Sequence, residues 1–169
     1  MARAEFLDVT VGRRRNMQSN RSKNTKPELL VRSLLHRLGY RFRLHRYDLP
    51  GRPDIVFPSR RAVVEVRGCF WHGHGCPLGQ IPKSRQDYWA PKLQATRERD
   101  ASNAVALNNA GWRVHEIWEC EIRTGAETIL NPLVAFLGPP RSQNSEAYRE
   151  FLAQFHEGQG LGKGGQRPC

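Results

Sequence analysis

Residues 53–68, with the sequence PDIVFPSRRAVVEVRG, contain two short apolar runs with a turn between them. The runs DIVF and AVVEV have the length and apolar content of strands, and PSRR has the composition of a turn. We therefore expect a β-hairpin in this segment. Asp54 begins its first strand and Glu65 lies near the end of its second, so the hairpin would bring the two carboxylates within a few ångströms of each other.

Segments on both sides of this hairpin show further patterns. In TKPELLVRSLLHRLGY, residues 25–40, leucine and valine recur at helical spacing, Pro27 suits the first turn and Gly39 suits the end, which predicts an amphipathic helix. The other expected elements are a strand at 41–45, an irregular segment at 81–91, a long polar helix at 92–109 and a last strand at 112–119. This order predicts an α/β fold, in which helices flank a mixed β-sheet.

The 169 residues are enough for one domain with its own core. No apolar run reaches the roughly 18 residues of a membrane span, and the N-terminus lacks a signal-peptide pattern. A soluble, cytoplasmic protein is therefore expected, of bacterial type and associated with the nucleoid. We also expect a monomer. Its predicted parts are a basic N-terminal arm at 1–24, a core at 25–140, a C-terminal helix at 141–156 and a disordered, glycine-rich tail at 157–169.

The chain is strongly basic. Lys and Arg number 27 against 16 Asp and Glu, which gives a formal charge of +11. Residues 1–60 contain 14 Lys and Arg against 5 Asp and Glu, so most of the excess positive charge lies in the first third of the chain. Such a charge in a soluble protein indicates an anionic partner, most simply nucleic acid.

Asp54 and Glu65 form the first candidate site. Two carboxylates on rigid neighbouring strands suit a hard divalent cation, which takes oxygen ligands and can bring a phosphate with it. Arg67 lies two residues after Glu65 and so on the same face of its strand. The pattern resembles the P-D…(D/E)-x-K signature of restriction-endonuclease-like nucleases, with arginine in the lysine position. The alternative is that the acids are solvated or salt-bridged carboxylates.

Two further residues could assist this site, and each has a structural alternative. Glu28 could supply a third acid from the first helix, but Thr25 and Glu28 also have the T-x-x-E spacing of a capping box, in which the glutamate only bonds a backbone N–H. His72 lies in the loop after the acids, where a histidine can act as general acid or base near neutral pH. A lone histidine more often has no special role.

Cysteine and histidine are concentrated in the stretch CFWHGHGC. Cys69, His74 and Cys76 supply two thiolates and an imidazole, which zinc favours in tetrahedral geometry, and a reducing cytoplasm disfavours disulfides. Cys120 follows the last predicted strand and would complete a Cys3His site with no open position, which makes the zinc structural. His72 is an alternative ligand. A further alternative is buried cysteines and a surface histidine without metal.

Phe70, Trp71, Tyr88 and Trp89 lie in segments expected to be irregular. Aromatic side chains of some DNA-binding proteins act as a wedge that unstacks base steps. They could equally pack around the zinc. For the set of four, contact with bases is the favoured interpretation.

Four motifs in this order, LPGRPDIVF, GCFWHGHGC, YWAPKL and GWRVHEIWEC, closely resemble the very short patch repair DNA mismatch endonucleases. The resemblance extends from about Asn16 to Cys120. It implies a restriction-endonuclease-like α/β fold with structural zinc, and a magnesium-dependent nick in double-stranded DNA 5′ to the thymine of a T:G mismatch. Such mismatches arise when 5-methylcytosine deaminates. Other mismatch repair proteins are the further partners that this family implies.

The resemblance also implies residue roles. Asp54 matches the metal-binding aspartate that holds Mg2+, Glu28 the glutamate of the first helix, and His72 the histidine that assists proton transfer. The remaining matches are the zinc ligands Cys69, His74, Cys76 and Cys120 and the DNA-intercalating aromatics Phe70, Trp71 and Trp89.

The chain departs from the family pattern at Glu65, Val66 and Arg67, where family members carry an apolar residue, threonine and histidine. The departure leaves open whether Glu65 or a backbone carbonyl near Val66 joins the Mg2+ shell. Arg67 could stabilise the charge of the pentavalent phosphate but, unlike histidine, it cannot exchange a proton near pH 7. We therefore expect His72 alone to handle the proton.

Two other functions are compatible with the sequence. One is an endonuclease of the same fold with another DNA target, such as modified DNA. The other is a zinc-stabilised DNA-binding protein without catalysis, in which Asp54 and Glu65 are structural.

Overall fold

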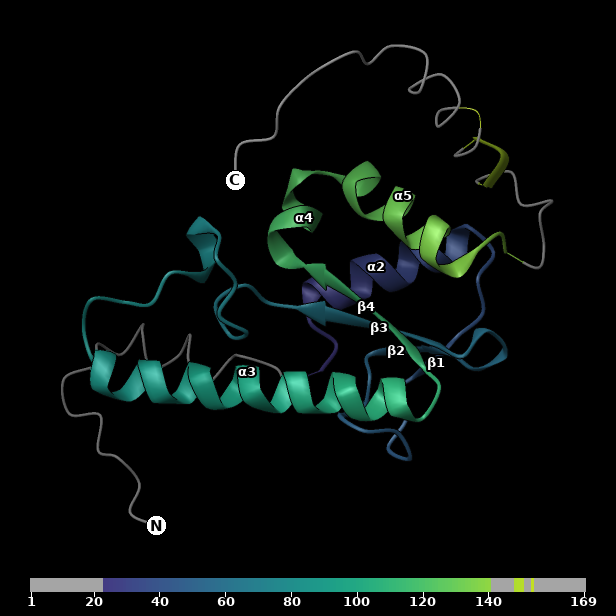
Figure 1. The fold of residues 1–169 in the computed structure, drawn as a ribbon. Coiled ribbons are helices and arrows are strands. Elements are labelled where there is room, and N and C mark those ends of the chain that lie inside the picture. The colour runs from purple at the N-terminus through teal and green to yellow at the C-terminus, as the bar shows by residue number, and fades with distance from the viewer. Residues whose placement is uncertain (1–22, 141–147, 151–152, 154–169) are drawn as a thin grey trace, which may run out of the picture.

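A computed structural model describes residues 23–140, 148–150 and 153. In Figure 1 the strands lie between helix α3 on one side and helices α2 and α5 on the other. The helices are α2 (Lys26–Arg37), α3 (Gln86–Asn109), α4 (Glu119–Thr124) and α5 (Ala126–Leu137), and the strands are β1 (Arg43–Leu44), β2 (Ile55–Phe57), β3 (Ala62–Arg67) and β4 (Arg113–Trp118). Short 3-10 turns follow β2 at Pro58–Arg60 and precede α3 at Pro77–Gly79.

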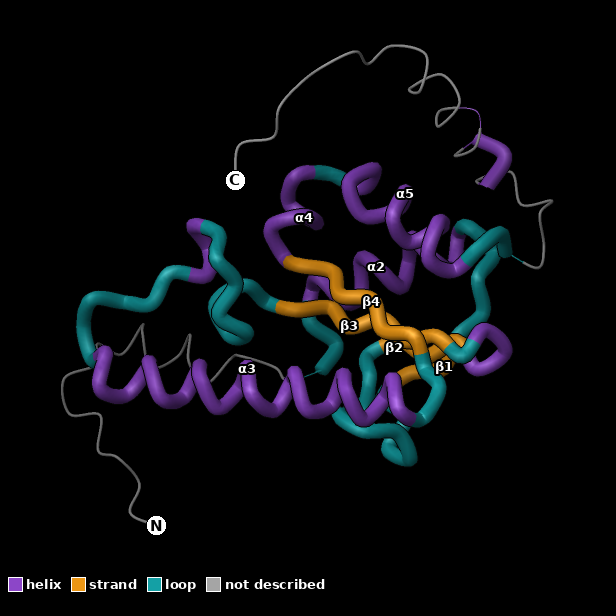
Figure 2. Tube along the Cα trace, viewed as in Figure 1, coloured by secondary structure: helices purple, strands orange, loops and turns teal. Residues whose placement is uncertain are grey.

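The four strands form one sheet in the order β1-β2-β3-β4 (Figure 2). Strands β1, β2 and β3 pair antiparallel, and β4 pairs parallel to β3. Ile55 is paired with Val64 and Phe57 with Ala62, so the predicted hairpin is confirmed. Parallel neighbours need a crossover connection, and α3 provides it. The predicted mixed sheet flanked by helices is therefore confirmed.

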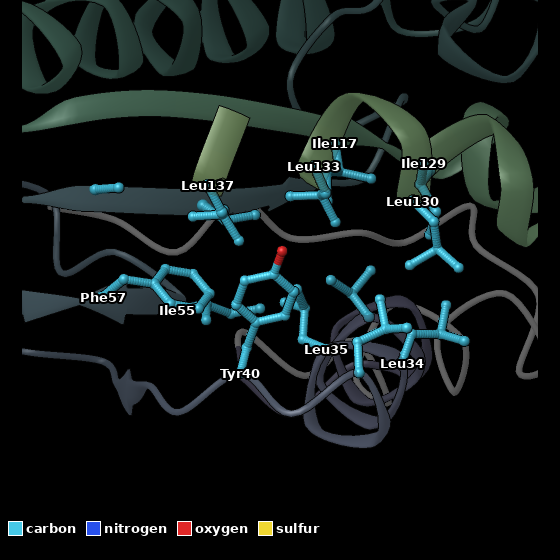
Figure 3. Packing of buried hydrophobic residues seen from close by; sticks show 14 of the residues in the cluster. Leu34, Leu35, Tyr40, Ile55, Phe57, Ile117, Ile129, Leu130, Leu133 and Leu137 are labelled. Carbon is cyan, nitrogen blue, oxygen red and sulfur yellow. The ribbon is translucent and has the colours of Figure 1, made fainter. Parts of the chain in front are cut away.

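Alternation of side chains along β2 and β3 divides the core between the two faces of the sheet. On one face, Ile55, Phe57 and Val64 pack against leucines of α2 and α5 (Figure 3). Burial of each such side chain contributes about 1.5–3 kcal/mol. The other face carries a smaller cluster, formed by Leu49, Val56, Val63, Leu107 and Trp112.

The same alternation determines where the polar side chains of β3 point. Val63 packs on the α3 face of the sheet, so Glu65 and Arg67 lie on that face as well. Arg67 reaches α3 directly, where its Nη1 lies 2.8 Å from Oδ2 of Asp100. The polar residues of β3 therefore lie between the sheet and α3.

Helix α3 begins at Gln86, so the prediction of an irregular segment up to residue 91 is wrong in its second half. Tyr88 and Trp89 belong to the first turn of α3, and the backbone N–H of each bonds the carbonyl of Arg85. Pro91 hides the start of this helix in the sequence pattern, because proline is usual only in the first turn of a helix. Here it lies in the second turn, where it removes one backbone hydrogen bond.

The sequence patterns also fail at other elements. Strand β1 has only two of the five residues expected at 41–45, and α4 and α5 are absent from the expected elements. Pro132 lies inside α5 and hides that helix in the same way as Pro91 hides the start of α3. The apolar spacing of a helix is nevertheless present in its buried residues Ile129, Leu130, Leu133 and Leu137.

The predicted terminal segments lie largely outside the described residues. Of the arm at 1–24, only Lys23 and Asn24 are described. Of the C-terminal helix at 141–156, residues 148–150 and 153 are described and are helical, and the tail at 157–169 is outside the description. Among the described residues, no helix has the length and apolar content needed to cross a membrane.

Candidate functional site

Asp54 immediately precedes β2, and Glu65 lies in the neighbouring strand β3. Because Ile55 is paired with Val64, the antiparallel register puts Asp54 next to Glu65. Oδ2 of Asp54 accepts a hydrogen bond from the backbone N–H of Val66 at 2.9 Å. The hairpin therefore brings the two acids together and holds one of them against the strand.

Both carboxyl groups lie in an environment that disfavours their ionised forms. Burial raises the pKa of Asp54, although the hydrogen bond from Val66 opposes this shift. Burial also raises the pKa of Glu65 to about 7, and the nearby charge of Asp54 adds to the effect. A divalent cation would relieve this crowding, and carboxylate oxygens are the ligands that a hard cation such as Mg2+ takes. The pair could therefore hold such a cation.

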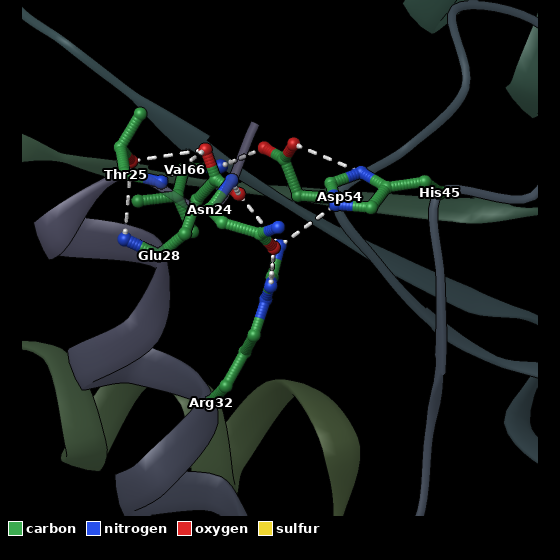
Figure 4. Close-up of polar contacts among 7 residues, drawn as sticks. All are labelled: Asn24, Thr25, Glu28, Arg32, His45, Asp54 and Val66. Carbon is green, nitrogen blue, oxygen red and sulfur yellow. Dashed lines mark hydrogen bonds and ion pairs between the residues drawn. The ribbon is translucent and has the colours of Figure 1, made fainter. Parts of the chain in front are cut away.

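Glu28 is buried, with 3% of its surface exposed, and both its oxygens accept hydrogen bonds (Figure 4). Oε1 accepts from Oγ1 of Thr25 at 2.9 Å, and Oε2 accepts from Nη2 of Arg32 at 2.6 Å. The backbone N–H of Glu28 bonds Thr25 Oγ1 in return, so the predicted capping box is present. The Glu28 charge adds to the rise in pKa that burial causes at Asp54. Its role as a third acid stays a prediction.

His72 is held by an acid that the sequence patterns do not identify. Its Nδ1 lies 2.6 Å from Oδ2 of Asp100 in α3. Because a carboxylate only accepts, Nδ1 carries the hydrogen, and Nε2 is the nitrogen that can accept a proton. Burial opposes ionisation of Asp100, but the hydrogen bond from His72 holds its pKa below the usual range. Asp100 follows the charged run RER on a polar helix, so no local signal distinguishes it from a solvated acid.

Arg67 is only 6% exposed and contacts two carboxylates. Its Nη1 lies 2.8 Å from Oδ2 of Asp100, and its Nε lies 2.9 Å from Oε1 of Glu116 on β4. Nη1 also lies 3.1 Å from Nδ1 of His72, a close approach and not a hydrogen bond because both nitrogens carry hydrogen, so Arg67, His72 and Asp100 form one cluster. These contacts tie Arg67 to the His72–Asp100 pair, and its predicted action on the phosphate stays a prediction.

Cys69, His74, Cys76 and Cys120 come together, and their ligand atoms lie within 4.8 Å of one another. The first three lie in the loop after β3, and Cys120 lies in the first turn of α4, directly after β4. Sγ of Cys120 lies 3.5 Å from Nδ1 of His74, and the backbone N–H of Cys120 bonds Sγ of Cys69 at 3.4 Å. The structure therefore assembles the Cys3His set, and His72 lies outside this cluster.

The loop that carries this cluster depends on a close backbone approach at Gly79. A Cβ atom at that position would overlap the carbonyl oxygen of His74, so only glycine fits. The His74 ring stacks on Trp118 with 4.2 Å between the ring centroids. Burial raises the pKa of the Cys69 thiol, and a bound cation would favour the thiolate. Three sulfurs and one imidazole at this separation fit a tetrahedral metal such as zinc.

Phe70, Trp71, Tyr88 and Trp89 are half-buried and pack on one another edge to face. The ring centroid of Phe70 lies 5.1 Å from that of Trp71 and 5.0 Å from that of Trp89. Nζ of Lys92 lies 5.8, 5.1 and 5.5 Å from the centroids of the Trp71, Tyr88 and Trp89 rings, within cation–π distance. The loop after β3 and the start of α3 thus share one aromatic cluster.

The sequence is similar to those of several known proteins. A family model described as "DNA mismatch endonuclease Vsr" matches residues 8–78. Over 110 residues the chain is 66% identical to the type II nicking enzyme V.XorIIP of Xanthomonas oryzae pv. oryzae, a stretch that covers 65% of this chain and 81% of the relative. Over 105 residues it is 45% identical to the type II nicking enzyme V.NmeAIP of Neisseria meningitidis, covering 62% of this chain and 75% of the relative.

A third relative carries the name of the family itself. Over 111 residues the chain is 40% identical to the DNA mismatch endonuclease Vsr of Escherichia coli, covering 66% of this chain and 71% of the relative. Identity at this level over most of the relatives' length is accompanied by a matching family model. The chain therefore belongs to the Vsr family of DNA mismatch endonucleases, and it is a DNA endonuclease.

Proposed function

We propose that this endonuclease nicks double-stranded DNA 5′ to the thymine of T:G mismatches that arise by deamination of 5-methylcytosine, in a Mg2+-dependent reaction. The observation that carries the proposal is that the hairpin brings Asp54 and Glu65 together, close enough to Asp100 for its charge to add to the rise in pKa that burial causes at Glu65, while Asp100 contacts His72. Hydrolysis of a phosphodiester needs a cation site and a proton acceptor, and these residues can supply both. The names of the relatives, two nicking enzymes and one mismatch endonuclease, support the same reaction.

Asp54 holds the cation, with Glu65 as a second carboxylate. When bound, Mg2+ supplies a more acidic water and offsets negative charge on the phosphate and the leaving 3′ oxygen. Glu28 is the third acid of the site, held next to Asp54 at the start of α2. If Glu65 keeps its proton, a backbone carbonyl near Val66 takes its place as the second oxygen ligand. Restriction-endonuclease-like enzymes use a comparable hairpin of acids, and we assign the chain to that fold.

His72 takes the proton from the attacking water. Asp100 keeps the hydrogen on Nδ1, which leaves Nε2 to accept this proton, and its charge stabilises the imidazolium that results. Arg67 adds a permanent positive charge beside the histidine. This charge favours the additional negative charge of the pentavalent phosphate.

Zinc in the Cys3His cluster has a structural role. The four residues of the Cys3His cluster would hold zinc as four protein ligands, which would leave no position for water or substrate. Through these residues zinc would tie the loop after β3 to α4. That loop carries Phe70, Trp71 and His72, so the metal positions the reactive side chains without acting in the reaction.

Selection of the mismatch comes from Phe70, Trp71 and Trp89, which enter the base stack beside the T:G pair. A wobble pair is easier to unstack than a matched pair, so insertion favours it. The basic arm at 1–24 binds phosphates without regard to sequence, and this binding weakens as salt rises. One nick needs one active centre, so a monomer suffices, and other mismatch repair proteins then act on the nicked strand.

A strand-specific nicking assay tests the proposal. End-labelled duplexes with a T:G pair, a T:A pair, a C:G pair or a 5-methylcytosine:G pair at one position are incubated with and without Mg2+. We expect a single nick, 5′ to the mismatched thymine and only with Mg2+. Matched duplexes should be cut about 100-fold more slowly, because unstacking them costs a few kcal/mol more and each 1.4 kcal/mol is about tenfold in rate.

Equal cleavage of the fully paired methylated duplex would instead assign the enzyme to the restriction of modified DNA. Binding of every duplex without cleavage in Mg2+ would contradict the proposal altogether.

His72→Ala should lower the nicking rate about 10²–10⁴-fold at saturating Mg2+, because general-base catalysis contributes that much. Its zinc content should not change, since His72 lies outside the Cys3His cluster. The matched control is His36→Ala, which removes an exposed histidine from the last turn of α2. Nicking by His72→Ala at the rate of the parent would show that another group accepts the proton.

A further inference from the structure

Arg32 of α2 is a buried cation next to the acids of the site. Only 7% of its surface is exposed, and its ion-pair partner Glu28 is buried as well. A buried ion pair seldom stabilises a fold more than apolar side chains of similar volume would. In the part of the chain that the structure describes, Nε of Arg32 is also a buried donor without a partner, which adds to the cost. Fold stability therefore gives no reason for an arginine here.

The guanidinium of Arg32 joins three other side chains (Figure 4). Nη1 donates to Oδ1 of Asn24 at 2.7 Å, and Nη2 donates to Oε2 of Glu28 at 2.6 Å. Nη2 also lies 3.0 Å from Nε2 of His45. Because arginine nitrogens only donate, Nε2 of His45 bonds Nη2 only as an acceptor, which puts the ring hydrogen on Nδ1. Arg32 thus determines the tautomer of His45.

His45 turns this Nδ1–H towards Asp54. Nδ1 lies 3.9 Å from Oδ1 of Asp54, roughly 1 Å beyond a normal N–H···O distance, while Oδ2 is bonded by the backbone N–H of Val66. In Figure 4 one ring nitrogen of His45 is joined to the guanidinium of Arg32 and the other to the carboxylate of Asp54. His45 directly follows β1 and has φ of 46°, a left-handed conformation that is uncommon outside glycine. This backbone conformation is strained, and it places the ring next to both groups.

We propose that Arg32 and His45 are positioning residues for Asp54. Arg32 holds the imidazole through Nε2, and the imidazole presents Nδ1–H to the Asp54 oxygen that Val66 does not bond. Arg32 also offsets the charge of Glu28, which would otherwise repel Asp54. Outer-shell partners of a ligating carboxylate orient it, and loss of one typically costs about 10–100-fold in metal affinity or activity. The inference rests on the proposed role of Asp54 as the cation ligand.

The test measures cation binding as well as activity. The full chain without DNA is titrated with Mn2+, a probe of the Mg2+ site, by electron paramagnetic resonance, and nicking is then assayed over a range of Mg2+ concentrations. Arg32→Met and His45→Phe should raise the Kd for Mn2+ and the Mg2+ concentration for half-maximal rate about 10–100-fold. The double variant should bind Mn2+ no more weakly than whichever single variant has the higher Kd, because Arg32 orients Asp54 through its contact with His45. KM for DNA at saturating Mg2+ should not change, which a general loss of structure would not allow.

Arg37→Met is the matched control, because it removes an exposed arginine from the same helix and should bind Mn2+ like the parent. His45→Phe leaves the Glu28–Arg32 pair in place, so it decides the question if Arg32→Met does not fold. If folded His45→Phe binds Mn2+ like the parent while Asp54→Asn loses binding, the inference about Arg32 and His45 is overturned and the proposed role of Asp54 stands. Parent-like binding by Asp54→Asn would instead overturn the proposed role of Asp54.

Discussion

Asp54→Asn is expected to abolish nicking and to leave the fold and DNA binding intact. The rate on a T:G duplex should fall about 10³-fold or more, because metal catalysis contributes several kcal/mol and each 1.4 kcal/mol is about tenfold in rate. Asparagine keeps the size of the side chain and can still accept the hydrogen bond from Val66. Strand-specific nicking, DNA binding in Ca2+ and thermal unfolding by circular dichroism measure the three quantities.

The stability of this variant follows from the same burial. Burial raises the pKa of Asp54 in the folded state above its unfolded value. Ionisation of this carboxyl therefore costs folding free energy as pH rises past the unfolded-state pKa, and a neutral asparagine removes that cost at neutral pH. Without a divalent cation, Asp54→Asn should be at least as stable as the parent, and with Mg2+ it should lose the parent's additional thermal stability.

Asp48→Asn is the matched control, because Asp48 is exposed in the loop before the hairpin and pairs with Arg46. This variant should nick like the parent. If Asp54→Asn instead kept more than about a tenth of the parent's rate at saturating Mg2+, a loss below 1.4 kcal/mol, Asp54 would not be the principal cation ligand.

Cys120→Ser is expected to lose zinc and to destabilise the protein strongly. Serine supplies no thiolate, and structural zinc sites bind with an apparent free energy of about 10–16 kcal/mol at pH 7. Even a quarter of that range, about 3 kcal/mol, lowers the Tm by about 6–12 °C in a chain of this size. Nicking should fall with it, because the loop that the zinc holds carries His72. Elemental analysis and thermal unfolding check the two results.

Cys169→Ser is the control for this variant, because it makes the same substitution at a cysteine that the predicted Cys3His ligand set does not include. Its zinc content and Tm should equal those of the parent. Retention of stoichiometric zinc by Cys120→Ser would contradict the Cys3His ligand set and would point to His72 as the fourth ligand. In that case His72→Ala would lose zinc as well as activity, which separates the two assignments.

The hairpin is predictable because its signals lie within sixteen consecutive residues. Apolar runs of strand length on either side of a turn leave one pairing, and that pairing puts Asp54 beside Glu65. The Cys3His cluster is partly local in the same way. Cys69, His74 and Cys76 follow from spacing, whereas Cys120 is selected only because it is the other cysteine next to a predicted strand.

The missed start of α3 and the missed helix α5 have a shared physical cause. Pro91 and Pro132 each lie inside a helix that packs against the sheet, α3 and α5 respectively. Proline costs about 3 kcal/mol in a helix interior, so the local pattern favours a boundary there. Burial of Leu93 in α3 and of four apolar side chains in α5 outweighs that local preference. Tertiary packing therefore overrides propensity in both elements.

Local residue patterns suffice for the mixed α/β architecture, the paired acids and three of the four Cys3His residues, because alternation and spacing act between near neighbours. Which charged groups meet is decided only in the packed fold. Asp100, the partner of His72, lies 28 residues after it in the chain, and His45, the partner of Arg32, lies 13 residues after it. The reason is that periodicity reports which face of an element is buried, whereas the partner of a polar side chain depends on how helices cross the sheet.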